Sequence, residues 1–169
     1  GHLRIGSVQT DSIMVLSDIT RADTLDITLL AGGDIVLDTG AIFMSNGNLL
    51  LDCGPSPNAI MPLTYGTEIE TDTLSFGSDL LFNIAGIIPD SLHDQLHVNG
   101  VINLTGVDLK VAGSYFPTFA DTFMIINNDS TDAIIGTFTG LPEGGTIANF
   151  LGTMLSATIT YTGGDGNDV

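Results

Sequence analysis

Four short apolar segments recur along this chain at a nearly constant interval, and this repeat restricts the possible folds more than any other feature. The segments are LDITL at 25–29, LLL at 49–51, LSF at 74–76 and LHV at 96–98, and they begin 24, 25 and 22 residues apart. Clusters of Gly, Asn and Asp flank them, as expected for half-buried strands. A period of about 20 to 45 residues built from short strands predicts an all-β solenoid, in which each coil buries its apolar side against the next.

Turn residues and prolines divide these coils, which we expect to occupy residues 1–112. Tight turns are predicted at 38–40 and 46–48, where Gly and Asn tolerate a positive φ. The Pro-rich stretch 54–62 is predicted to be a loop rather than a central strand, because proline has no N–H to donate to a ladder. A second loop is expected at 87–94.

Residues 113–169 have a different character, and we expect them to form a β-rich cap on the last coil. Five of the eight phenylalanines lie here, at 116, 119, 123, 138 and 150. An open solenoid end exposes apolar core and unpaired strand edges, so a differently folded segment should close it. Short strands are predicted at 122–126, 134–138 and 157–161.

The charge of the chain limits its partners. Twenty acidic residues against three basic ones give a formal net charge of −17. Such a field repels phosphate backbones and anionic membranes, so we expect no nucleic-acid partner. No apolar run approaches the roughly 18 residues of a membrane span. Gly1-His2 looks like a tag remnant and residues 165–169 stop in mid-pattern, so we expect the chain to be part of a larger polypeptide.

Four segments, taken in order, carry a family resemblance. They are DQLHVNGVINLTGVDL at 94–109, FPTFADTFMII at 116–126, GTFTGLP at 136–142 and YTGGDGND at 161–168. This order is similar to the C-terminal region of bacterial autotransporter-like passenger domains and of surface proteins with autotransporter-associated β-strand repeats. Residues 20–53 resemble filamentous-haemagglutinin-type coils more loosely.

The resemblance implies a right-handed parallel β-helix that is secreted or displayed on a bacterial cell surface. It implies a structural role, as stalk and end cap for adhesion or surface display, and it carries over no catalytic residue. Two alternatives stay open. One is a module that binds glycans or a receptor through the loops at 54–62 and 87–94. The other is a fragment of a carbohydrate-active β-helix enzyme.

Two oxygen-rich segments are candidates for calcium binding. NNDSTD at 127–132 offers oxygen ligands at alternating positions, and Ca²⁺ takes six to eight oxygens. GGDGND at 163–168 resembles a single copy of a calcium-binding nonapeptide repeat. Ordinary structural turns are the favoured explanation of both segments, and no other cofactor is expected. The candidate ligands are Asn127, Asp129, Asp132, Asp165 and Asp168.

Other reactive side chains favour structural interpretations. The only cysteine, Cys53, follows a strand and is expected to be a buried or half-buried thiol. His93 and His97 are expected to be exposed histidines, about 13 Å apart if both lie on one extended strand. For the enzyme alternative, paired carboxylates are abundant (Glu68, Glu70, Asp72 and Asp79), but the basic residues are widely separated in sequence (Arg4, Arg21 and Lys110).

Overall fold

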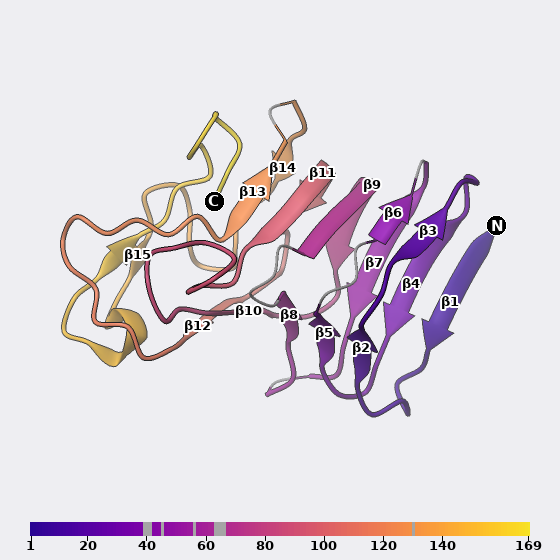
Figure 1. Ribbon diagram of the computed structural model, residues 1–169, viewed down its shortest axis with the longest axis horizontal. Coiled ribbons are helices and arrows are strands. Elements are labelled where there is room, and N and C mark those ends of the chain that lie inside the picture. Colours follow the sequence, from indigo (N-terminus) through magenta and orange to yellow (C-terminus); the bar gives the residue numbers. More distant parts are fainter. Residues whose placement is uncertain (39–41, 45, 56, 63–66, 130) are drawn as a thin grey trace.

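The computed structural model describes residues 1–38, 42–44, 46–55, 57–62, 67–129 and 131–169. The chain forms a β-solenoid of about four turns, with 43% of its residues in strands, and its large sheets are parallel (Figure 1). The fold class predicted from the repeat is therefore confirmed. The turn predicted at 38–40 lies largely outside the described residues.

One face of the solenoid is a five-stranded parallel sheet. Its register aligns one branched apolar residue from each coil in a single column, Ile13, Ile35, Ile60, Leu80 and Leu109. Branched side chains pack well on a pleated surface, which favours this stacking. In spatial order the strands are β12 (Leu109–Ala112), β10 (Leu80–Asn83), β8 (Ile60–Pro62), β5 (Ile35–Leu37) and β2 (Ile13–Val15).

A nine-stranded sheet supplies two further faces. One stack contains β1 (His2–Gly6), β4 (Asp26–Leu30), β7 (Asn48–Asp52), the second halves of β9 (Thr67–Phe76) and β11 (Leu96–Asn103), and β14 (Ile134–Ile135). The other contains β3 (Ile19–Arg21), β6 (Ile42–Met44), the first halves of β9 and β11, and β13 (Ile126–Asn128).

The corner between these two faces requires glycine in β11. The register of β11 against β9 shifts between Asn99 and Val101, and Gly100 between them has φ +138°. A Cβ atom on Gly100 would lie 1.8 Å from the carbonyl oxygen of Thr71 on the coil below. Only glycine allows both this φ and this close approach.

The register confirms that three of the four predicted apolar segments stack on one another, and it places the fourth on a different face. Ile27 lies beside Leu49, and Leu49 lies beside Leu74. Leu74, however, lies beside Ile102, while Leu96 lies beside Thr67. The LHV segment at 96–98 therefore belongs to the preceding face, because the loop between β10 and β11 lengthens this coil and the spacing of apolar segments no longer equals the length of a coil.

The prediction that residues 54–62 form a loop throughout is also wrong, because Pro62 ends a central strand, β8. It pairs with Leu37 of β5, and β8 lies between β5 and β10. The N–H of Ile60 points toward β10 and bonds the Asp79 carbonyl, so the nitrogen of Pro62, two residues on, faces the same side. On that side β8 pairs with β10 only at Ile60. The N–H that Pro62 lacks therefore costs no hydrogen bond between the two strands.

The interior between the faces is a continuous apolar core. Ile27, Leu29, Leu49, Leu51 and Leu74 are all fully buried, and one cluster joins them to the C-terminal segment. Each such side chain contributes about 1.5–3 kcal/mol through its burial. Cys53 also belongs to this cluster, as predicted.

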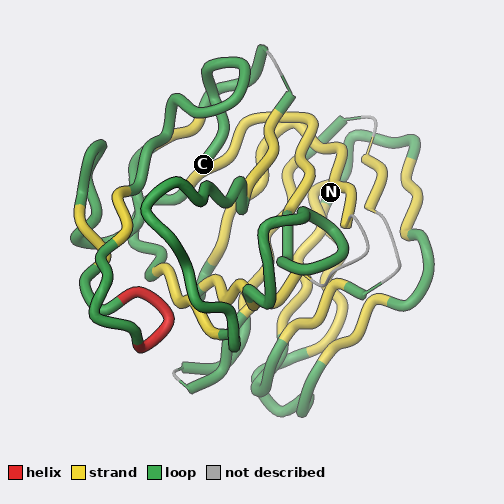
Figure 2. The backbone as a smooth tube through the Cα atoms, turned by 60° about the vertical axis from the view of Figure 1, so that its left-hand side comes forward, coloured by secondary structure: helices red, strands yellow, loops and turns green. Residues whose placement is uncertain are grey.

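The C-terminal segment continues the stack before it closes it. β13 and β14 both pair in parallel with β11, so parallel pairing extends beyond residue 112. The strands predicted at 122–126, 134–138 and 157–161 are shorter and partly shifted in the structure. Irregular chain predominates in the rest, with an antiparallel pair, β15 (Thr146–Ile147) and β16 (Ala157–Thr158), and a 3₁₀ turn at Phe150–Gly152 (Figure 2).

Some of the aromatic side chains of this segment fill the space under it. Phe138 and Phe150 are buried, and the Phe123 ring lies 5.7 Å from Phe150. Phe116 and Phe119 are instead 82% and 97% exposed.

Candidate functional site

The C-terminal residues cover the outer edge of β13, the last strand of its stack. Ile126 and Val169 exchange both backbone hydrogen bonds, at 3.2 and 3.0 Å. The next outward-facing amide, that of Asn128, donates to Asp168 Oδ1 at 2.8 Å. Figure 1 shows the C-terminus beside β13. The backbone groups that would otherwise form an open parallel edge are therefore bonded within the chain.

A tight turn over residues 163–168 holds Asp168 in this position. Gly163 and Asp168 form an antiparallel bridge, and the Asp165 amide donates to Asp168 Oδ2 at 3.3 Å. Gly164 has φ +50°, and a Cβ atom there would lie 1.7 Å from Asp168 Oδ2. The GGDGND sequence thus bends the chain back so that one buried carboxylate caps both its own turn and β13.

This turn lies against the 127–132 segment, so the two candidate calcium motifs meet. Asn167 Nδ2 donates to the carbonyl oxygens of Asp129 and of Asp132, the latter at 2.6 Å. Asn128 Nδ2 donates to the same Asp132 carbonyl at 2.9 Å. The residues that Asn167 bonds here are 35 and 38 positions away in sequence, and the sequence pattern alone did not indicate that the two segments would be neighbours.

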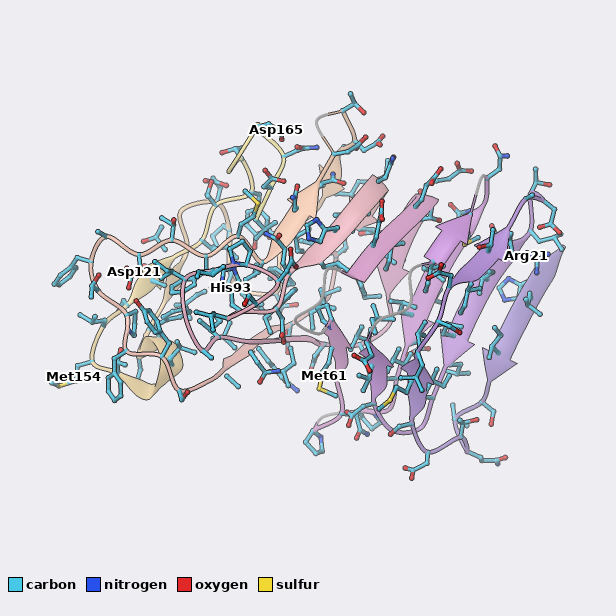
Figure 3. The ribbon with its side chains drawn as sticks, viewed as in Figure 1. Arg21, Met61, His93, Asp121, Met154 and Asp165 are labelled. Carbon is cyan, nitrogen blue, oxygen red and sulfur yellow. The ribbon has the colours of Figure 1, made fainter. Side chains whose placement is uncertain are left out.

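The five predicted ligands do not converge on one point. Asp129 and Asp132 lie together, whereas Asn127 is directed toward His97 Nδ1, at 3.4 Å. The Asp168 carboxylate accepts the Asn128 and Asp165 amides, and Asp165 is exposed near the tip of the turn (Figure 3). Among the described residues, no group of three or more His, Cys, Asp or Glu side chains is placed to hold a metal. Any site here would therefore depend on the amide oxygens of Asn128 and Asn167, which are not among the predicted ligands.

Buried oxygens without partners mark this junction. The side-chain Oδ1 atoms of Asn128, Asp129 and Asn167 are all buried, and none has a hydrogen-bond partner among the described residues. The Asn128 side chain belongs to a residue that is only 1% exposed. The neighbouring Asp129 carboxylate raises the pKa of Asp132, and burial raises it further. Within the described part of the junction, oxygens are thus crowded without a matching set of donors.

The histidine prediction is wrong for His93, which is buried between the coils and the C-terminal segment (Figure 3). Its Nδ1 lies 3.1 Å from the Gly86 carbonyl oxygen and its Nε2 lies 3.3 Å from that of Met124. Because the 84–95 loop folds back, His97 Nε2 reaches Asp90 Oδ2 at 2.9 Å. The contact with Met124 fastens the loop to the C-terminal segment, and the contact between Asp90 and His97 fastens it to β11.

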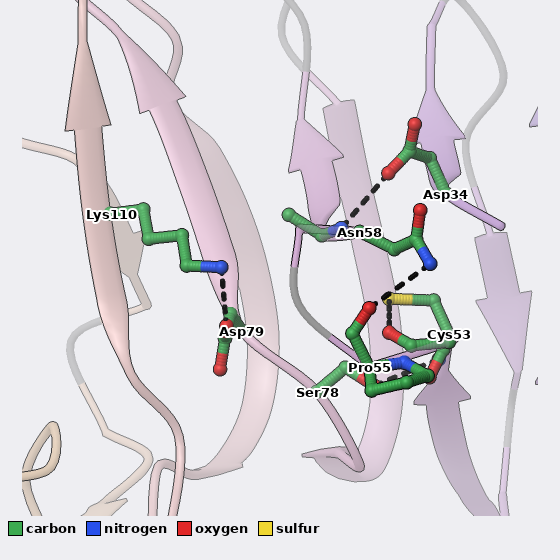
Figure 4. A network of polar contacts seen from close by, with 9 residues as sticks. Asp34, Cys53, Pro55, Asn58, Ser78, Asp79 and Lys110 are labelled. Atoms are coloured by element: carbon green, nitrogen blue, oxygen red, sulfur yellow. Dashed lines mark hydrogen bonds and ion pairs between the residues drawn. The ribbon is translucent and has the colours of Figure 1, made fainter.

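The basic residues lie apart from this junction. Lys110 Nζ pairs with Asp79 Oδ2 at 2.6 Å, close to the turn that carries Cys53 and Pro55 (Figure 4). Arg21 pairs with Asp23 at 2.6 Å, and Arg4 is in β1 at the other end of the stack. Glu68 and Glu70 are exposed on β9, while Asp72 accepts the Gly47 amide at a corner.

A cavity of about 480 Å³ lies between the last coil and the cap. Ile84, Val111, Phe150 and Leu155 contribute apolar walls. Its carboxylate, that of Asp121, accepts the Thr118 amide and the Tyr115 hydroxyl, and these bonds lower its pKa. The cavity is therefore mainly apolar, and the Asp121 carboxylate in its wall is already hydrogen-bonded within a turn.

Comparison with protein-family models, curated proteins and solved structures found no match for this chain. In the described part of the chain, no helix has the length and apolar character needed to cross a membrane.

Proposed function

We propose that this chain is a non-enzymatic structural segment of a secreted or cell-surface bacterial protein. It acts as a β-helical scaffold with a covered C-terminal end, in adhesion or surface display. The observation that carries the proposal is the covered edge of β13, where Asp168 and Val169 bond the outward-facing amides. A solenoid needs such closure to stay soluble, because an open strand edge pairs with other chains.

The opposite end of the stack supports the same role. All five residues of β1 are exposed, including Leu3 and Ile5, and among the described residues β1 pairs only with β4. Apolar side chains on an unpaired parallel edge suit a preceding coil. The partner we propose for this face is therefore the remainder of a larger polypeptide. The net charge of −17 favours solubility and disfavours phosphate-bearing partners.

Truncation tests the capping role. A chain ending at Thr162 loses the bonds from residues 163–169 to β13, and a chain ending at Val111 loses the whole cap. We expect both to self-associate, with fibril-like or polydisperse species in analytical ultracentrifugation and light scattering. Asp165→Ala is the matched control, because its exposed side chain lies in the same turn. A Thr162 truncate that stays monodisperse and melts like the full chain would refute the proposal.

A ligand-binding module is the second candidate. The observation that favours it is the apolar cavity under the cap, with the 97% exposed Phe119 among its lining residues. Exposed apolar side chains beside a concave surface mark interaction sites. Glycan-array and cell-binding assays separate the two candidates. A scaffold alone gives no specific signal, and a binding module gives one that Phe119→Ala abolishes.

A further inference from the structure

Among the described residues, the junction of the 127–132 and 163–168 segments contains buried oxygens that no donor satisfies. Asn128 Oδ1, Asp129 Oδ1 and Asn167 Oδ1 are buried and lack a hydrogen-bond partner among the described residues. A buried polar group that is left unbonded destabilises the folded protein, so each of these oxygens calls for a partner. The amide nitrogens of Asn128 and Asn167 both bond the Asp132 carbonyl, which directs these two side chains toward Asp132.

Negative charge is concentrated at the same point. Asp129 and Asp132 are three residues apart, and the single Asn167 amide nitrogen bonds the backbone carbonyls of both. The basic side chains do not neutralise them, because Lys110 and Arg21 form their ion pairs elsewhere and Arg4 belongs to β1. Two carboxylates, buried amide oxygens and no basic partner form an environment that suits a divalent cation.

We propose that Asn128, Asp129, Asp132 and Asn167 together bind one calcium ion between the two segments. Calcium fits this donor set because it accepts carboxylate and amide oxygens in irregular arrangements. Magnesium requires a near-ideal octahedron and retains its water, so a site of mixed, partly buried oxygens discriminates against it. Asp129 and Asp132 are only half-buried, so the ion has a path from solvent.

Such an ion would clamp the turn that covers β13. Asn128 belongs to β13 itself, whereas Asn167 is next to Asp168, whose carboxylate bonds the Asn128 amide. Calcium bridging Asn128 and Asn167 therefore holds the covering turn against the last strand. This consequence rests on the proposed capping role, but binding of the ion does not.

Calcium binding to the full chain tests the site directly. The protein is stripped with chelator and titrated calorimetrically up to about 10 mM CaCl₂, a range that includes the 10⁻⁴–10⁻³ M affinities of extracellular calcium modules. Ionic strength is held constant, and MgCl₂ is the parallel titrant. We expect one saturable calcium site per chain, a melting temperature raised by about 3–6 °C at a tenfold excess over Kd, and a weaker response to magnesium.

Two variants locate the ion. Asp129→Asn with Asp132→Asn relieves the carboxylate repulsion, so it should fold, and it should lose the calcium response. Asp165→Asn removes the same kind of charge from the exposed tip of the turn and should retain it. Hydrogen exchange at the Ile126 and Asn128 amides should slow on calcium addition, since these amides bond Val169 and Asp168.

Three results would overturn the proposal. They are the absence of saturable binding, an equal response to magnesium, and an unchanged response in the double variant. Saturable binding without slower exchange at Ile126 and Asn128 would overturn the clamp. Self-association of the Thr162 truncate is measured separately, so failure of the calcium site and failure of the capping role are distinguishable.

Discussion

Replacing Tyr161 with phenylalanine tests whether the cap is held by specific hydrogen bonds or only by apolar burial. The Tyr161 hydroxyl donates to the Leu141 carbonyl at 2.7 Å and accepts the Phe138 amide at 2.9 Å. Tyr161 is buried beside Phe138, which is completely buried, and burial raises the pKa of the Tyr161 phenol. Tyr161→Phe removes one oxygen and leaves the aromatic packing in place.

The expected loss follows from the groups left behind. The Phe138 amide becomes a buried donor without a partner, which costs about 1–3 kcal/mol, and the lost bond to the Leu141 carbonyl adds about 0.5–1.5 kcal/mol. We therefore expect the free energy of unfolding to fall by about 2–4 kcal/mol. For a chain of this length, that lowers the melting temperature by about 5–12 °C.

Calorimetry and denaturant unfolding measure this loss, and hydrogen exchange locates it at the Phe138 amide. Tyr115→Phe is the matched control. Its hydroxyl bonds the Asp121 carboxylate in a more open place, where water can replace it, so a much smaller effect is expected. Equal melting temperatures for the two variants, with the Phe138 amide still protected, would show that the hydroxyl does not hold the cap.

Two further predictions concern pH and the coil corner. Burial raises the pKa of Asp94, so the folded chain binds a proton more readily there than the unfolded chain does. The stability of the wild type relative to Asp94→Asn should therefore increase as pH falls from neutral to about 4, and denaturant unfolding at several pH values that shows the opposite trend would contradict the assignment. Gly100→Ala should destabilise the chain by about 1–3 kcal/mol more than Gly106→Ala, since a Cβ atom at Gly100 meets the Thr71 carbonyl and one at Gly106 meets nothing within 4 Å. Thermal melts compare these two variants directly, and equal losses would argue against a tight corner.

The repeat of apolar segments was enough to predict the fold class, because stacking apolar layers at a fixed interval leaves few alternatives to a solenoid. It was not enough to assign every strand to a face. Counting from one apolar segment to the next assumes coils of equal length, and the 84–95 loop breaks that assumption, so Leu96 is paired with Thr67 rather than with Leu74. His93 was misplaced for a different reason, since the burial of a loop depends on what folds over it, here the C-terminal segment at Met124.

The candidate site was predicted only in part. The acidic positions in two segments indicated calcium, but a pattern of acidic residues does not show which side chains are already committed to turns. Asp168 is used to cap β13, and the amides of Asn128 and Asn167 matter through contacts between distant parts of the chain. Unpartnered buried oxygens are a property of packing, and no local pattern in the sequence reports them.

The two ends of the stack differ in the direction of their pairing, and this difference determines where another coil can be added. Within the two large sheets, the described strands pair in parallel. Ile126 and Val169 instead exchange both of their hydrogen bonds, the pattern of an antiparallel pair, and the next outward amide is bonded by a side chain. A further parallel coil would have to displace both contacts at β13. At β1 it would meet an exposed edge whose register matches that of the coils below, so the solenoid can be extended at that end.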